Sequence, residues 1–89
     1  MQSVFATVSG LVQGVSYRAS LRQQARRRGL TGWVRNRSDG RVEFHLQGDP
    51  EAVAEVIAWA RAGPRHARVD DVVCQTIERD PSLADFEIR

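Results

Sequence analysis

Hydrophobic and polar residues alternate with a period of two at the start of the chain. Val4, Ala6 and Val8 fall on one side of residues 3–9, and this period predicts a strand. A loop that contains two glycines, residues 10–16, follows. The change from alternation to a glycine-bearing loop indicates that the first strand ends here.

A helical pattern begins after this loop. Residues 17–28 are good helix formers, and Tyr17, Leu21 and Ala25 share one stripe. Ser16 is placed to cap the start of this helix, and Gly29 is placed to close its end. We therefore expect a first helix of about three turns.

The next pattern is typical of a β-hairpin. Residues 33–37 and 41–47 are joined by Ser38, Asp39 and Gly40, and an Asp-Gly pair between alternating segments favours a tight turn. In the second strand three apolar residues alternate with three polar ones, namely Val42, Phe44 and Leu46 against Glu43, His45 and Gln47. The alternation predicts one buried and one exposed face.

A second helix and two further strands complete the predicted order. Asp49, Pro50 and Glu51 are a helix opening, and apolar residues then recur at helical spacing until Gly63 and Pro64. Residues 69–77 are rich in β-branched residues, with a bulge predicted at Asp70 and Asp71, and residues 86–88 predict a short last strand. The order βαββαβ, with a small extra strand, predicts an α+β ferredoxin-like sandwich in which two helices cover one face of an antiparallel sheet. We expect one domain over residues 1–89.

Composition changes this picture in two ways. All thirteen basic residues are arginine, against eleven acidic residues, for a formal charge of +2. The absence of lysine excludes a covalent lysine mechanism. The net charge is too small to indicate nucleic-acid binding, whereas the use of arginine alone favours the recognition of planar oxyanions. The single cysteine, Cys74, excludes an internal disulfide, and the first residues lack a secretion signal, so we expect a cytoplasmic protein without a membrane span.

The loop between the first strand and the first helix is the strongest candidate for chemistry. Gly10 and Gly14 permit backbone angles that turn successive amides toward one point, and the helix N-terminus adds unpaired donors. Arg18, in the first helical turn, can reach the same point with a forked guanidinium. The alternative is an ordinary connection with a surface arginine, since short glycine patterns are weak signals.

Other phosphate and metal chemistries fit the sequence poorly. A P-loop needs a lysine, and a cysteine phosphatase needs an arginine six positions after its thiolate, where Asp80 follows Cys74. We therefore interpret Cys74 as a small buried strand residue. His45 and His66 lie far apart in the sequence, do not form a metal-ligand pair, and are predicted on the surface.

Nucleic-acid binding is a further alternative, because a ferredoxin-like sheet can bind RNA. Four arginines of the first helix could form a basic patch: Arg22, Arg26, Arg27 and Arg28. The stronger interpretation is that they complement the helix dipole, since the polar face of residues 41–47 offers no stacking aromatic residues. Trp33 and Trp59 are accordingly predicted to be packing residues.

Two motifs resemble the signatures of the acylphosphatase family. They are Gly-Leu-Val-Gln-Gly-Val-Ser-Tyr-Arg at residues 10–18 and Gly-Trp-Val-Arg-Asn-Arg-Ser-Asp-Gly-Arg-Val at residues 32–42. The resemblance extends over essentially the whole chain and includes Gln47-Gly48, Gly63-Pro64 and Ala67-Arg68-Val69. Many relatives have Phe where this chain has Tyr17, Gly where it has Ser16, and one aromatic residue beyond Arg89.

The resemblance implies an enzyme that hydrolyses acyl phosphates without a metal or cofactor. The loop formed by Gln13, Gly14, Val15, Ser16, Tyr17 and Arg18 would cradle the phosphoryl group with its backbone amides, Arg18 would hold the phosphoryl oxygens, and Asn36 would orient the attacking water. Inorganic phosphate would be both product and competitive inhibitor, and the protein would act as a monomer that binds neither nucleic acid nor membrane.

The chemistry of the reaction agrees with this small set of residues. The leaving carboxylate is a weak base and needs no general acid, so the site must only position the reactants and stabilise charge. Asn36 lacks basicity, which suggests that the substrate phosphate accepts the proton of the water. Without the resemblance, the preferred interpretation of Asn36 is that it initiates the turn before Ser38. A non-catalytic anion-binding or RNA-binding module is the alternative function. Acetyl phosphate, 1,3-bisphosphoglycerate, carbamoyl phosphate and a phosphorylated protein carboxylate are all open as substrates.

Overall fold

The computed structural model describes residues 1–89 and contains five strands and two helices. Their bounds in chain order are β1 (Gln2–Leu11), α1 (Tyr17–Arg27), β2 (Thr31–Asn36), β3 (Val42–Gly48), α2 (Pro50–Ala62), β4 (Arg68–Thr76) and β5 (Phe86–Ile88). Every predicted element is present, and no bound differs from the predicted one by more than two residues. Neither helix has the length and apolar content needed to cross a membrane.

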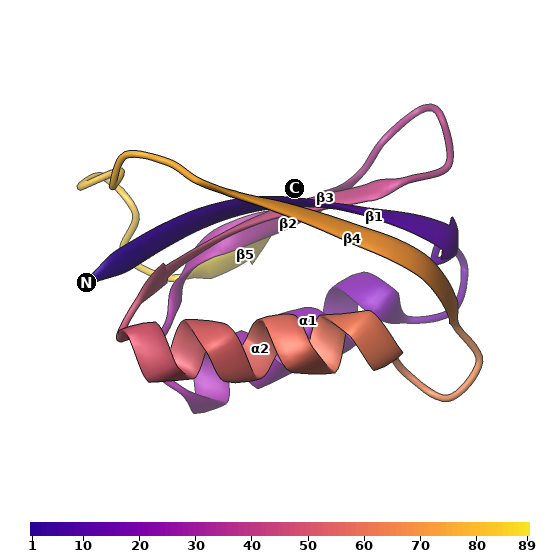
Figure 1. Ribbon diagram of the computed structural model, residues 1–89, viewed down its shortest axis with the longest axis horizontal. Coiled ribbons are helices and arrows are strands. Elements are labelled where there is room, and N and C mark those ends of the chain that lie inside the picture. The colour runs from indigo at the N-terminus through magenta and orange to yellow at the C-terminus, as the bar shows by residue number, and fades with distance from the viewer.

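The five strands form one sheet in the order β4-β1-β3-β2-β5, and both helices lie on the same side of it (Figure 1). The four longer strands pair antiparallel with one another, as predicted for a ferredoxin-like sandwich. The predicted short extra strand, β5, pairs parallel to β2, so the sheet is mixed at this edge. The reason is that residues 77–85 return the chain across one end of the sheet before β5 begins.

The core lies between the sheet and the helices. It joins the alternating apolar residues of β1 and β3 to the stripes of α1 and α2, for example Val8, Phe44, Leu21 and Val56. Gly29, with φ of 68°, closes α1 as predicted, since the amide of Leu30 bonds back to the Ala25 carbonyl. The buried stripe of Tyr17, Leu21 and Ala25 holds α1 against the sheet along its length.

The bulge predicted in β4 is present and lies beside the glycine loop. Ser9 pairs with Asp71 and Gly10 pairs with Val69, so Asp70 is the extra residue. Gly10 has φ of 124°, and a Cβ atom there would collide with the carbonyl oxygen of Arg68. A glycine is therefore required where β1 leaves the sheet toward α1.

Candidate active site

The turn between β1 and α1 owes its shape to two residues with left-handed backbone angles. Gly14 has φ of 74° and Ser16 has φ of 65°. No atom lies within 4 Å of a Cβ built on Gly14, so its role is conformational rather than steric. Ser16 is the residue before α1, but its side chain makes no capping hydrogen bond, and the prediction of a serine cap is wrong. In the left-handed conformation, which glycine adopts without strain, the Ser16 hydroxyl is not held over the first helical amides.

A cavity of about 160 Å³ lies at this turn. Its lining residues are Val12, Gly14, Ser16, Tyr17, Arg18, Ala19 and Ile88. Thus most of the loop predicted to bind phosphate borders one hollow, together with Ile88 from β5. Sequence reasoning missed Ile88, because its position depends on the non-local pairing of β5 with β2.

Arg18 is half-buried at this cavity and makes no hydrogen bond or ion pair within the protein. It stands in the first turn of α1, where the helix dipole is already positive, and no acidic residue lies in that turn. The charge of the Arg18 guanidinium and the positive end of the helix dipole therefore lie together, and no acidic side chain is paired with either. Such an arrangement favours an anion at the cavity.

Asn36 ends β2 on the face of the sheet that the helices cover. Val34 pairs with Ile88, and Asn36 is the next residue of β2 on the same face as Val34. Asn36 Oδ1 is buried and has no hydrogen-bond partner, and it is the one such side-chain atom in the protein. A buried amide oxygen without a partner is costly unless a water or ligand hydrogen-bonds to it.

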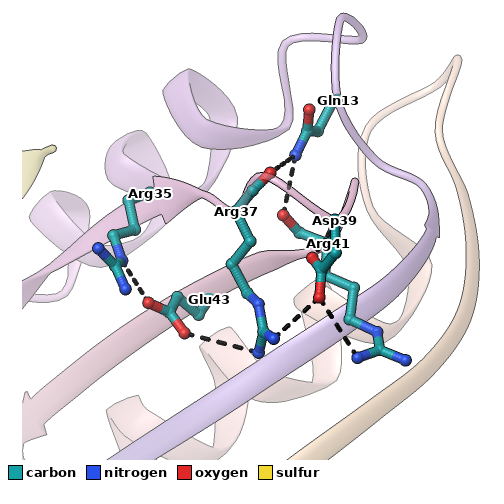
Figure 2. A network of polar contacts seen from close by, with 6 residues as sticks. All are labelled: Gln13, Arg35, Arg37, Asp39, Arg41 and Glu43. Carbon is teal, nitrogen blue, oxygen red and sulfur yellow. Dashed lines mark hydrogen bonds and ion pairs between the residues drawn. The ribbon is translucent and has the colours of Figure 1, made fainter.

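Gln13 ties the loop to the hairpin that carries Asn36 (Figure 2). Its Nε2 donates to the carbonyl of Arg37 at 2.8 Å and to the carbonyl of Arg41 at 2.9 Å. The amide of Arg37 also donates to the Arg41 carbonyl at 2.8 Å, which closes the hairpin turn. One side chain therefore links the two motifs, a role beyond the backbone contribution expected of Gln13 from the sequence.

The arginines of the hairpin are paired with acidic residues (Figure 2). Arg35 and Arg37 both contact Glu43, whose side chain is 7% exposed, and Arg37 also pairs with Asp39 at 2.8 Å. Arg41 reaches Asp39 at 3.5 Å. The positive charge on either side of Asn36 is thus compensated within the hairpin, unlike that of Arg18.

Two other loop residues turn their side chains inward. Tyr17 is buried, and its hydroxyl donates to the Ala60 carbonyl at 2.8 Å, a bond that phenylalanine cannot make. Burial raises the pKa of Tyr17 well above its usual range, so the phenol is neutral. Val15 packs against the core. Tyr17 and Val15 can therefore offer the cavity only their backbone.

The prediction that His45 lies on the surface is wrong, whereas His66 is exposed as predicted. His45 is 5% exposed, and its Nε2 lies 2.6 Å from Ser3 Oγ. Burial lowers its pKa. The face expected to be exposed is covered because Trp33 packs on His45 and residues 78–80 bond to Ser3 and Gln47.

Both tryptophans pack against neighbouring side chains, as predicted. The ring centroid of Trp33 lies 6.1 Å from that of Phe5, and the centroid of Trp59 lies 5.7 Å from that of Tyr17. Cys74 is half-buried against the core. No group of three or more His, Cys, Asp or Glu residues is arranged to hold a metal ion.

Fold and cavity together define a small α+β domain with an anion-favouring turn, and the comparisons with known proteins assign it to a family. The acylphosphatase family model matches residues 4–88. A protein named acylphosphatase from Thiobacillus denitrificans is 50% identical over 89 residues, covering 100% of this chain and 98% of that protein. One from Pyrobaculum arsenaticum is 51% identical over 82 residues, covering 91% and 86% respectively.

The fold also matches solved structures of acylphosphatases. The crystal structure of acylphosphatase from Bacillus subtilis matches with a TM-score of 0.95 at 31% identity and covers 100% of this chain and 99% of that one. The structure of an acylphosphatase from Coxiella burnetii matches with a TM-score of 0.91 at 39% identity and covers 99% and 92%. The chain belongs to the acylphosphatase family and is a hydrolase that acts on acyl phosphates.

Proposed function

We propose that Arg18 and the backbone amides of residues 13–18 bind the phosphoryl group of an acyl phosphate, and that Asn36 orients the water that attacks phosphorus. Arg18 brings a guanidinium without an internal partner to a cavity at a helix N-terminus. A guanidinium and converging amides stabilise the charge that spreads over the phosphoryl oxygens in the transition state. Gln13 holds the loop at a fixed place relative to the strand of Asn36.

The single observation that carries the role of Asn36 is its buried Oδ1 without a partner. An amide oxygen accepts a hydrogen bond from water and fixes its orientation, but it is too weak a base to take the proton. We therefore propose that a phosphoryl oxygen of the substrate accepts this proton as the new P–O bond forms. The bond to the acyl oxygen breaks, and the carboxylate leaves with the electron pair.

The leaving group determines which phosphate compounds this site can hydrolyse. A carboxylate leaves without a proton, whereas an alkoxide needs a proton donor or a metal ion. Asp39 is the acidic residue of the two motifs, and the Arg41 amide, with the charges of Arg37 and Arg41, holds its pKa below the usual range. Asp39 is thus ionised at neutral pH and cannot act as the acid.

Hydrolysis of benzoyl phosphate and of glycerol phosphate in excess chelator tests this proposal. We expect turnover of benzoyl phosphate, competitive inhibition by inorganic phosphate, and no turnover of glycerol phosphate above background. Comparable rates on the two substrates, or loss of benzoyl phosphate turnover in chelator, would show that an acid or a metal takes part.

We extend the proposal to a monomer that works in the reducing cytoplasm. A lone free cysteine is compatible with a reducing compartment. Light scattering should give the mass of a single 10.0 kDa chain. A stable dimer would contradict the monomer.

A further inference from the structure

A second hollow adjoins the phosphoryl cavity along the outer flank of α1. It is lined by Ala19, Arg22, Gln23, Arg26 and Arg27, and Ala19 also lines the cavity of Arg18. Arg22 follows Arg18 by four residues, so the two lie on one side of the helix with Cα atoms about 6 Å apart along its axis. The two hollows are therefore neighbours along α1.

Three of the five residues that line this hollow are arginines, and none is acidic. The Arg22 side chain is half-buried and makes no hydrogen bond or ion pair within the protein, although the Asp85 carboxylate lies within range of its charge. Its neighbour Arg26 pairs with Asp85 at 2.9 Å across the gap to β5. One carboxylate thus faces both Arg26 and Arg22, so the hollow keeps a net positive charge beside the Arg18 guanidinium.

The hollow of Arg22 is lined by different residues from the hollow at Asn36, where the water is proposed to attack. In-line attack requires the acyl oxygen to leave on the side of phosphorus opposite the water. Asn36 borders a hollow formed by Arg35, Arg37, Ser38 and Glu43, which shares no residue with the hollow of Arg22. The arginines beside Asn36 are also paired with acids, so they offer an incoming anion less attraction than Arg22 does.

We propose that Arg22 forms a second anion subsite, which binds a negatively charged group on the acyl part of the substrate. This inference rests on the proposed function, because it takes the phosphoryl group to lie at Arg18. It names the substrate class more closely: acyl phosphates whose acyl group bears a carboxylate or phosphate, in preference to those with a neutral acyl group. The apolar side chain of Ile88, at the border of the cavity, can contact the carbon skeleton between the two charges.

A pair of nearly isosteric substrates tests the subsite. We would measure kcat/KM for 4-carboxybenzoyl phosphate and for 4-carbamoylbenzoyl phosphate, which differ in charge but little in size. The unaltered protein should prefer the carboxylate about three- to fivefold at low ionic strength, the range of one solvent-accessible ion pair, and salt should reduce this preference. R22Q should abolish the preference.

The matched control is R79Q, which removes the same charge from an exposed arginine in the loop after β4, at the other end of the sheet. It should retain the preference. An equal preference in R22Q and the unaltered protein, or equal losses on both substrates in R22Q, would overturn the subsite. Failure of the unaltered protein to hydrolyse either substrate would instead overturn the proposed function, so the two outcomes are distinguishable.

Discussion

Two groups of arginines lie near the candidate site, and they differ in how their charge is balanced. Arg18 and Arg22 on α1 form no ion pair, whereas Arg35, Arg37 and Arg41 of the hairpin share Glu43 and Asp39. The hairpin therefore resembles a structural ion-pair network, and the start of α1 resembles a binding site. Residue type alone does not separate these roles, since all five residues are arginine.

The largest effect should come from removing the unpaired charge in the cavity. R18A should lower kcat/KM for benzoyl phosphate by about a thousandfold or more and weaken inhibition by phosphate, as expected when a bidentate contact to the reacting group is lost. R18K should restore little activity, because an ammonium cannot reproduce the planar fork. Circular dichroism should show the native fold.

R41A is the matched control for this substitution. It removes the same charge from a hairpin arginine that is paired with Asp39, and its kcat/KM should stay within about threefold, since exposed ion pairs contribute little. Similar losses in R41A and R18A would abolish the distinction between the two groups.

Breaking the link between the two regions should have the next largest effect. In Q13E the Nε2 donor becomes an oxygen that faces the carbonyls of Arg37 and Arg41, so two hydrogen bonds are replaced by repulsion. We expect kcat to fall about ten- to a hundredfold, because misplaced reactants lose rate steeply. If Gln13 acts by positioning Asn36, adding Q13E to N36A should cost little more activity, whereas full additivity of the two losses would exclude this coupling.

Removing the carboxylate that balances the hairpin should affect stability more than rate. E43Q keeps the shape of the side chain but leaves Arg35 and Arg37 without their shared partner. The free energy of unfolding in urea should fall by about 1–2 kcal/mol, as for a lost hydrogen bond to a charged group. A loss of activity like that of R18A would place the hairpin charges in the reaction.

The smallest effect concerns the backbone of the loop. Ser16 has a left-handed backbone conformation that costs a residue with a side chain about 1 kcal/mol. S16G should therefore raise the free energy of unfolding by up to about 0.5 kcal/mol, once the greater freedom of glycine in the unfolded chain is included. G14A, which introduces the same strain at Gly14, should lower stability, and a stabilised G14A would contradict this interpretation.

Local patterns were sufficient to predict the elements of the fold. The Asp49 side chain accepts a hydrogen bond from the Ala52 amide at the start of α2, the Asp-Gly turn closes the hairpin, and the bulge lies at Asp70. Each of these three features depends on residues that are close in the sequence or that lie on two paired strands. Such features can be predicted from residue type and spacing.

Features that depend on distant segments could not be predicted in this way. His45 is buried because Trp33 and residues 78–80 cover its face of the sheet, and β5 is parallel to β2 because the chain crosses the end of the sheet first. The same holds for the candidate site: the motifs drew attention to the loop and to Asn36, but the link through Gln13 and the position of Ile88 at the cavity depend on tertiary contacts.

Comparing kcat with phosphate binding in N36A tests the central claim most directly. If Asn36 orients the water while Arg18 and the loop hold the phosphoryl group, N36A should lower kcat for benzoyl phosphate by a factor of about a hundred or more and change the inhibition constant for phosphate less than about threefold. A parallel loss of both quantities in a folded N36A protein would contradict the account and assign Asn36 to binding or to the structure of the hairpin.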